Sequence, residues 1–396
     1  MWASARGSDP GASAVKLGAD GDVRPFLVET SLVETSMSLA DLETRAEQGD
    51  VRAQVQWAVL LEAQGRDYDA LRFLALAAQA DDPEAMARLG LKLVTGSGAP
   101  QRPADGVSLL SDAAGRGDPR AAELLAVLAA GGFFMPQSWS RALDHLQRSA
   151  ELGSSASREE LRILAGAPAA GGEQDWRQLR QGVDLQPWLA RPECRVLRDS
   201  PRILAIDALA SPLVCDWIVR RCEGRLAPAE VDDPRTGLPV MGRTRTNRLA
   251  NFGLAETSVL NILLQTRIGA AIGSPLAVME AFAVLNYRPG EEASDHFDYL
   301  DPGVPAYAEE ISRVGQRIAT ALVYLNEDYE AGETDFPELG LSHRGAKGDA
   351  LVFFSVDPRG SPDPRTRHAG RPTTKGEKWV LSQFVRDRPV APGPSR

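Results

Sequence analysis

A short motif of small and acidic residues returns four times in the first half of this 396-residue chain. It reads AEQGD from Ala46, AQADDPEA from Ala78, AGRGDPRA from Ala114 and AELGSSAS from Ala150, at spacings of 32, 36 and 36 residues. Such a period is typical of solenoids of helix pairs, because one pair cannot bury its apolar face without a neighbour. Alanine lets helices approach closely, glycine or aspartate ends one helix, and Asp-Pro begins the next. We therefore predict an α-solenoid over residues 38–164, with an irregular helical bundle as the alternative.

The character of the sequence changes after the repeats. Residues 165–190 are rich in Gly, Pro and Ala before they become polar, which predicts a linker that carries a short helix. Over residues 191–390, runs of β-branched and aromatic residues such as RIATALVYLNED and GDALVFFSVD alternate with Gly/Pro turns, a pattern typical of strands. Two helical stretches, 211–222 and 257–273, interrupt this pattern. We therefore predict a C-terminal double-stranded β-helix (jelly roll) with supporting helices.

The two ends of the chain have a different composition. Residues 1–37 are rich in Ala, Ser, Gly and Asp without clear periodicity. We predict that they are mostly disordered, with one short strand near Phe26–Val28, and that residues 391–396 form a tail.

Composition limits what the chain can bind. With 43% hydrophobic and 25% charged residues it has the profile of a soluble globular protein, and its formal net charge of −10 argues against a nucleic-acid partner. No apolar run approaches the ~20 residues of a membrane span. The first residues lack the apolar core of a signal peptide, and only three cysteines occur in the whole sequence. These features predict a cytoplasmic protein that does not contact a membrane.

Three residues form the first chemical signal. His296 and Asp298 stand two positions apart, so in a strand their side chains would point to the same face. His368 follows after a strand and a loop, and the antiparallel strands of a jelly roll can return it to the same site. Two imidazoles and one carboxylate on one face are the facial triad that binds non-haem Fe(II) and leaves three coordination positions open. A structural zinc site is the alternative, but the lack of a cysteine ligand favours an open catalytic site.

Two further residues suggest a ligand beside the metal. Lys378 stands ten residues after His368, and Tyr287 stands nine residues before His296. A lysine one strand-length beyond the distal histidine could pair with the far carboxylate of a dicarboxylic acid, and the tyrosine could donate a hydrogen bond to the same group. A surface lysine and a tyrosine that only fills the core are the alternatives.

The segment from about 243 to 388 resembles the prolyl 4-hydroxylase-type 2-oxoglutarate- and Fe(II)-dependent dioxygenases. The matching stretches are, in order, NYRPGEEASDHFDYLDP, GQRIATALVYLNEDYEAGETDFPELGL, KGDALVFF and HAGRPTTKGEKWVLSQFVR. The repeats resemble the short tetratricopeptide-like (Sel-like) repeats of many bacterial proteins. The first resemblance implies that Fe(II), 2-oxoglutarate and O₂ take part in the reaction, with ascorbate as a reductant.

This resemblance also implies roles for individual residues. Three positions match the iron ligands of the family: His296, Asp298 and His368. Four match residues around the C5 carboxylate of 2-oxoglutarate: Lys378, Tyr287, Thr334 and, as in some relatives, Tyr324. Arg317, in GQR, matches an arginine near the mouth of the active site that handles substrate, and we predict it as a catalytic residue, with a plain salt bridge as the alternative.

Other positions carry weaker signals. Many relatives have a second tryptophan where this chain has Phe384, which keeps an aromatic wall but removes an N–H donor. The stretch GRTRTNRLANF lies near the peptide groove in the family, which implies either substrate contact or a solvated face for Arg243, Arg245 and Arg248. His343, in a predicted turn, is expected to be exposed, and His145 is expected to be a surface residue on a predicted repeat helix.

The expected reaction is hydroxylation of an unactivated C–H bond, coupled to oxidative decarboxylation of 2-oxoglutarate to succinate and CO₂. The resemblance favours a prolyl residue in a peptide or protein, and the repeats favour a macromolecular partner because solenoids present extended surfaces. A free amino acid or small metabolite is the alternative substrate. A repeat scaffold that senses 2-oxoglutarate or oxygen with little turnover is the alternative class of protein. The sequence leaves the regiochemistry and the oligomeric state open.

Overall fold

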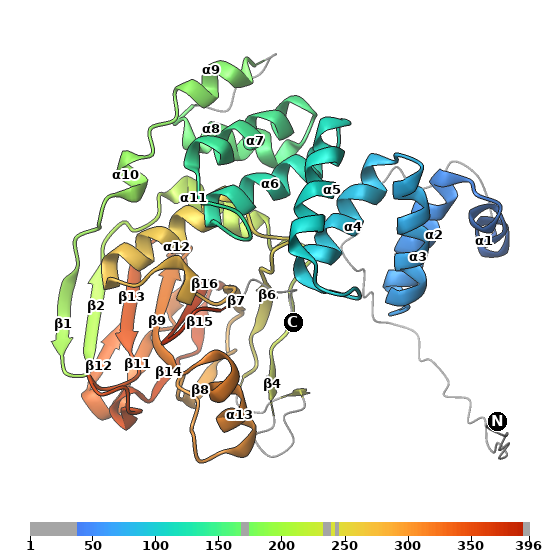
Figure 1. Cartoon of the computed structure of the whole chain (residues 1–396). Helices are drawn as coiled ribbons and strands as arrows, with labels where there is room; N and C mark the ends of the chain where they lie inside the picture. The colour runs from blue at the N-terminus through green and yellow to red at the C-terminus, as the bar shows by residue number, and fades with distance from the viewer. Residues whose placement is uncertain (1–37, 168–173, 233–238, 242–244, 391–396) are drawn as a thin grey trace, which may run out of the picture.

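The repeats fold as consecutive helices, each packed on the next (Figure 1). The computed structural model describes residues 38–167, 174–232, 239–241 and 245–390, so the predicted N-terminal segment, its strand at Phe26–Val28 and the C-terminal tail lie outside the described residues. The repeat helices are α1 (Leu39–Glu47), α2 (Val51–Ala63), α3 (Asp67–Gln79), α4 (Pro83–Thr95), α5 (Pro103–Gly115), α6 (Pro119–Gly131), α7 (Trp139–Glu151) and α8 (Ser155–Leu164). The predicted α-solenoid is confirmed.

The repeated motif sets the start of every second helix. Its polar residue directly precedes α2, α4, α6 or α8 and accepts a hydrogen bond from a backbone N–H three residues on; these residues are Asp50, Asp82, Asp118 and Ser154. Each such N-cap stabilises its helix by about 1 kcal/mol. The four equivalent alanines of the motif are all buried, which lets neighbouring helices pack closely.

Two short helices join the solenoid to the strands. They are α9 (Trp176–Gln181) and α10 (Gln186–Leu189), with residues 168–173 outside the described ranges. Helix α9 packs on α7 and α8, and α10 packs on a helix of the C-terminal part. The connection between the two parts therefore lies along their surfaces.

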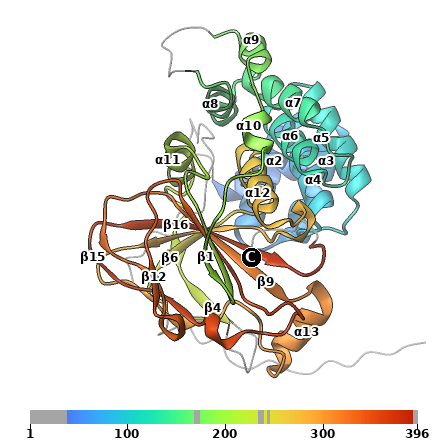
Figure 2. The same cartoon turned by 90° about the vertical axis from the view of Figure 1, so that its left-hand side faces the viewer.

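The strands form two sheets that face each other, the arrangement of a jelly roll (Figures 1 and 2). The larger sheet has the order β1 (Arg195–Asp199), β2 (Arg202–Ile206), β13 (Ala350–Phe354), β9 (Arg317–Tyr324), β16 (Lys378–Arg386), β7 (Ala283–Tyr287), β6 (Arg248–Asn251) and β3 (Ala227–Pro228). The smaller sheet has the order β12 (Leu341–His343), β11 (Thr334–Phe336), β14 (His368–Gly370) and β8 (Ala293–His296). Their strand pairs are antiparallel, and the jelly-roll prediction is confirmed.

Smaller elements complete the C-terminal part. Two-stranded ribbons are formed by β10 (Glu330–Ala331) with β15 (Thr373–Lys375), and by β4 (Glu230–Asp232) with β5 (Pro239–Met241). Short 3₁₀ turns are η1 (Leu276–Val278), η2 (Pro337–Leu339) and η3 (Pro364–Thr366). The helices are α11 (Pro212–Arg220), α12 (Val259–Ile272) and α13 (Pro305–Val314). The first two occur where the sequence predicts helices.

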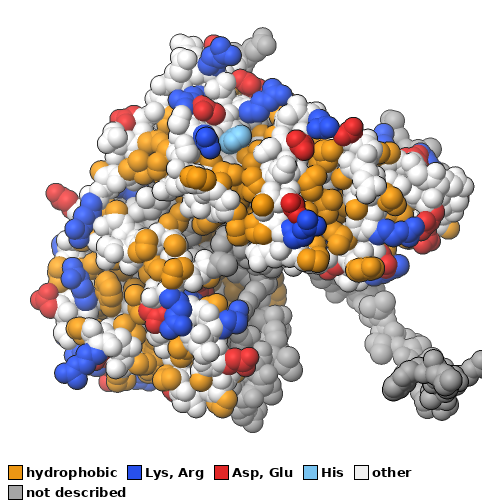
Figure 3. All heavy atoms as spheres, in the orientation of Figure 1, with side chains coloured by type: hydrophobic (Ala, Val, Ile, Leu, Met, Phe, Trp, Pro, Cys, Tyr) orange, Lys and Arg blue, Asp and Glu red, His pale blue; other side chains and the backbone are white. Residues whose placement is uncertain are grey.

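Helix α12 lies between the large sheet and the repeats (Figures 1 and 2). Most residues of its sequence, VLNILLQTRIGAAI, are apolar and most are buried, as expected of a helix that packs against neighbours on more than one side. It begins with a capping box formed by Ser258 and Asn261 and contacts both α6 and α8. One continuous hydrophobic core therefore runs from the repeats into the C-terminal part. In the space-filling view the N-terminal repeats project to one side of the β-rich part (Figure 3).

Side chains of β16 point alternately to the two faces of the large sheet, so one set lines a pocket and the other set joins the core. Lys378, Val380, Ser382 and Phe384 point between the two sheets, where they line a pocket. Leu381 and Val385, on the other face, join the core under the helices. Within the described ranges, no helix combines the length and the apolar character that crossing a bilayer requires.

Candidate active site

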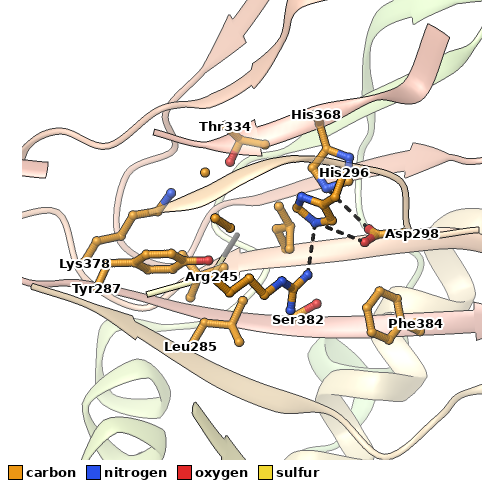
Figure 4. A pocket seen from close by; sticks show the side chains of 14 residues that line it. Arg245, Leu285, Tyr287, His296, Asp298, Thr334, His368, Lys378, Ser382 and Phe384 are labelled. Carbon is orange, nitrogen blue, oxygen red and sulfur yellow. Dashed lines mark hydrogen bonds and ion pairs between the residues drawn. The ribbon is translucent and has the colours of Figure 1, made fainter. Parts of the chain in front are cut away.

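Two neighbouring strands of the smaller sheet bring the two histidines together. His296 ends β8 and His368 begins β14, and the antiparallel register places them directly opposite each other. The centroids of their rings lie 4.3 Å apart. One ligand atom from each ring and one from Asp298 all lie within 4.8 Å of one another (Figure 4). The three predicted iron ligands therefore meet in one place.

Asp298 reaches this place by a different route from the predicted one. Strand β8 ends at His296, so Asp298 lies in the turn beyond it, and strand alternation does not orient its side chain. The carboxylate is instead held by Thr320 of β9, whose hydroxyl donates a hydrogen bond to Oδ2 at 2.7 Å. Oδ1 lies 3.5 Å from Nε2 of His296, and Oδ2 lies 3.5 Å from Nε2 of His368.

Backbone carbonyls orient both imidazole rings. Nδ1 of His296 lies 2.7 Å from the carbonyl oxygen of Ser294, and Nδ1 of His368 lies 3.0 Å from that of Thr366. A carbonyl only accepts hydrogen bonds, so each Nδ1 carries a proton and Nε2 is the ring atom that remains for a metal. Both Nε2 atoms face the carboxylate of Asp298 (Figure 4). This arrangement is that of metal-binding histidines fixed by an outer hydrogen bond.

The surroundings of His368 and Asp298 shift the pKa of each. Burial lowers the pKa of His368 to about 4, so this ring is neutral at physiological pH. Burial opposes the charge on Asp298, but His368, His296 and the Thr320 hydroxyl together hold its pKa below the ordinary value. One carboxylate and two imidazole lone pairs directed at one point suit a divalent transition metal, and nitrogen and oxygen donors with no sulfur suit Fe(II). The residues present therefore fit the iron that the sequence predicts.

Lys378 lies at the other end of the same pocket (Figure 4). It is 2% exposed, and its Nζ donates a hydrogen bond to the carbonyl oxygen of Gly332 at 2.6 Å. The rings of Tyr287 and Tyr324 lie 5.4 and 5.8 Å from Nζ. Burial lowers the pKa of Lys378 to about 8, although the charge of Glu333 opposes this shift, and within the described ranges no Asp or Glu forms a direct ion pair with it. A buried ammonium group without a direct ion pair has the charge and the hydrogen-bond donors to accept the carboxylate of a ligand.

The other three predicted cofactor residues surround Lys378. Tyr287 of β7 is its cross-strand neighbour, and burial raises the pKa of this tyrosine to about 12, so the phenol keeps its proton for donation. Thr334 of β11 also lines the pocket. The hydroxyl of Tyr324 lies 3.1 Å from that of Thr334 but is not itself among the pocket-lining groups. Tyr324 therefore supports Thr334 from behind.

Arg317 is not brought together with these residues. Its guanidinium group donates two hydrogen bonds to the carboxylate of Glu280, at 2.8 and 3.0 Å. It lies over the ring of Phe384, 4.0 Å from the ring centroid, and it is absent from the pocket lining, whereas Phe384 is present. This placement corresponds to the salt-bridge alternative, with Arg317 backing the aromatic wall of the pocket.

The arginine-rich stretch contributes one residue to the pocket. Arg245 lines it, and its Nη2 lies 3.0 Å from Nε2 of His296 (Figure 4). Arg248 instead hydrogen-bonds to Asn286 and lies 3.8 Å from the carboxylate of Glu377. Arg243 lies outside the described residues.

The two remaining histidines are both half-buried. His343 does not lie in a turn: it ends β12, half-buried, with its ring centroid 5.9 Å from that of Tyr324. The sequence did not predict this strand, because β12 is only three residues long and follows shortly after the 3₁₀ turn η2. His145, on α7, is also half-buried, and burial lowers the pKa of both rings. The prediction of an exposed His343 is therefore wrong, whereas His145, predicted as a surface residue on a repeat helix, does lie on such a helix with its side chain partly exposed.

Comparison with known proteins agrees with this geometry. Residues 282–386 match the family model of the 2OG-Fe(II) oxygenase superfamily, a stretch that contains the triad and Lys378. Prolyl 4-hydroxylase 1 of Arabidopsis thaliana is 31% identical over 239 residues, which cover 54% of this chain and 82% of the plant protein. The fold and site thus define an oxygenase dependent on Fe(II), 2-oxoglutarate and O₂. Within that class, the chain belongs to the prolyl 4-hydroxylase family.

Solved structures resemble each part of the chain separately. The viral collagen prolyl hydroxylase of Paramecium Bursaria Chlorella virus-1, solved as a 2OG complex, is 25% identical and covers 48% of this chain and 98% of its own, with a TM-score of 0.37. A Sel1 repeat protein from Oxalobacter formigenes is 28% identical and covers 32% of this chain and 97% of its own, with a TM-score of 0.29.

Proposed function

We propose that this oxygenase hydroxylates a prolyl residue in a peptide or protein. The observation that carries the proposal is the convergence of His296, Asp298 and His368 at one end of a pocket whose other end holds Lys378. The relationship to prolyl 4-hydroxylases supports the choice of a prolyl substrate. The solenoid supports a macromolecular partner, because it offers an extended surface beside the catalytic part.

The triad and the lysine divide the work of binding. His296, Asp298 and His368 would hold Fe(II), which when bound supplies the activation of dioxygen that an unactivated C–H bond requires. Lys378 would bind the C5 carboxylate of 2-oxoglutarate, with Tyr287 and Thr334 donating hydrogen bonds to the same group. Apolar residues of the pocket, among them Leu285, Leu322 and Val380, would keep water away from this charged contact.

The experiment measures the release of succinate from 2-oxoglutarate in the presence of Fe(II) and ascorbate. Proline-containing peptides and free amino acids are added in turn as candidate substrates. A prolyl peptide should stimulate succinate formation and gain a hydroxyl group, and Asp298→Ala should abolish both. If only a free amino acid stimulates succinate formation, the substrate is a small molecule and not a peptide. Succinate formation that no substrate stimulates would favour a sensing scaffold.

We also propose a reductant and a cellular location. Ascorbate is included as reductant because of the family resemblance. A cytoplasmic location is proposed because the three cysteines, Cys194, Cys215 and Cys222, are all free thiols.

A further inference from the structure

One buried hydroxyl contacts the triad from outside the pocket lining. Thr320 lies in the middle of β9, opposite Phe353 of β13 and Phe384 of β16, and it is completely buried. Its hydroxyl lies 2.7 Å from Oδ2 of Asp298. An ionised carboxylate can only accept hydrogen bonds, so the threonine is the donor. The β-branched side chain has restricted rotamers in a strand, which fixes the direction of this donor.

We propose that Thr320 is a positioning residue for the metal ligand Asp298. Its hydrogen bond to Oδ2 would fix the direction of the carboxylate and leave the other lone pairs of the group available to a metal. This inference rests on the proposed function, since it gives Thr320 a role only if the triad binds metal. On this proposal, a residue of the large sheet orients Asp298, whereas both histidines belong to the small sheet.

The location of Asp298 makes such support necessary. It lies beyond the end of β8, so the sheet ladder that fixes His296 does not fix the aspartate. Among the described residues, the polar groups that contact its carboxylate are the two histidines and Thr320. If the histidines bound a metal, they would no longer be free to hold the carboxylate. Thr320 would then be the hydrogen-bond donor that orients it. Outer hydrogen bonds of this kind typically change metal affinity by 10–100-fold.

The test is a calorimetric titration of the full-length protein with Mn(II), a redox-stable probe of the iron site. Thr320→Val keeps the shape of the side chain and removes the hydroxyl, so it should weaken Mn(II) binding by roughly 10–100-fold. Thr320→Ser should bind Mn(II) like the wild type, which a role in packing alone would not produce. Thr266→Val is the matched control, because that hydroxyl donates only within α12, to the carbonyl oxygen of Ile262.

The outcomes separate this inference from the proposed function. If Asp298→Ala abolishes Mn(II) binding while Thr320→Val binds like the wild type, the role of Thr320 is wrong and the metal site stands. If Asp298→Ala binds Mn(II) like the wild type, the proposed function itself fails. Should Thr320→Val not fold, the pair Thr320→Ser and Thr320→Ala makes the same comparison, since both lack the methyl group and only serine keeps the hydroxyl.

Discussion

At the scale of single residues, the unusual group is Lys378, a buried lysine that forms no direct ion pair with any Asp or Glu in the part of the chain that the structure describes. Burying an ammonium group is costly unless something compensates its charge. The carbonyl oxygen of Gly332, the two tyrosine rings beside the lysine and the charge of Glu333 compensate only in part, since burial still lowers the pKa of Lys378 to about 8. A bound carboxylate would complete the compensation, which explains why a stable fold keeps such a residue.

We predict that Lys378→Met raises the KM for 2-oxoglutarate by roughly 30-fold, since a hydrogen bond to a charged group is worth about 2 kcal/mol. Metal affinity should change little, because Lys378 does not contact the triad. The control is Lys375→Met, which removes an exposed lysine paired with Glu330. An unchanged KM in Lys378→Met would show that the carboxylate binds elsewhere.

The same residue predicts a pH dependence. Lys378 is charged below its pKa of about 8 and neutral above it. The value of kcat/KM for 2-oxoglutarate, which reports the free enzyme, should therefore fall as the pH rises through 8. In Lys378→Arg the side chain stays charged and this fall should disappear.

The residues of the site were predictable from the sequence to different degrees. The triad and Lys378 stand in motifs that follow one another in the order seen in the family, so they could be predicted from the sequence. Thr320 was missed, because a threonine in an apolar strand looks like any other β-branched residue and its partner comes from a distant turn. Arg317 was placed at the active-site mouth by resemblance, but its partner Glu280 carries no sequence signal.

At the scale of elements, helix α12 depends on a carboxylate from the repeats. Glu160 of α8 is buried and accepts a hydrogen bond from the backbone N–H of Leu260, in the first turn of α12, at 2.6 Å. Free N–H groups at a helix start favour an anionic acceptor. Burial nevertheless raises the pKa of Glu160 to about 7, with Glu123 of α6 adding repulsion and Ser258 and Arg221 opposing it.

This raised pKa predicts how stability depends on pH. The folded state binds the proton of Glu160 more tightly than the unfolded state, so the stabilisation is complete below pH 4.5 and is lost as the pH rises to about 7. The loss is on the order of 3 kcal/mol. Urea unfolding at pH 5 and pH 8 should show a smaller difference in Glu160→Gln than in the wild type.

The neighbouring residue provides the control for this prediction. Glu159 is exposed and pairs with Arg220 at the surface. Glu159→Gln should keep the wild-type difference between the two pH values. Equal pH dependence in wild type and Glu160→Gln would mean that Glu160 is not the group responsible.

The elements themselves were largely predictable from the sequence. The period of the repeats predicted the solenoid, and the Asp-Pro pairs marked helix starts, because capping is local chemistry. The packing of α12 between sheet and repeats was not predictable, since contacts between distant segments such as Glu160 and Leu260 leave no local pattern.

At the scale of the whole molecule, the repeats and the oxygenase part share one hydrophobic core across α12. The repeats are thus an integral part of the protein, with their N-terminal helices projecting to one side (Figures 1 and 3). Surface that projects beside a catalytic part is available to a large substrate. The catalytic part keeps its two sheets facing each other, and the site lies between them.

The most direct test of the account is an anaerobic titration of the full-length protein with Fe(II) and 2-oxoglutarate. We predict one Fe(II) and one 2-oxoglutarate bound per chain, with both lost in His368→Ala and only the 2-oxoglutarate weakened in Lys378→Met. Undiminished binding of Fe(II) by His368→Ala, or of 2-oxoglutarate by Lys378→Met, would contradict the assignment of this pocket as the active site.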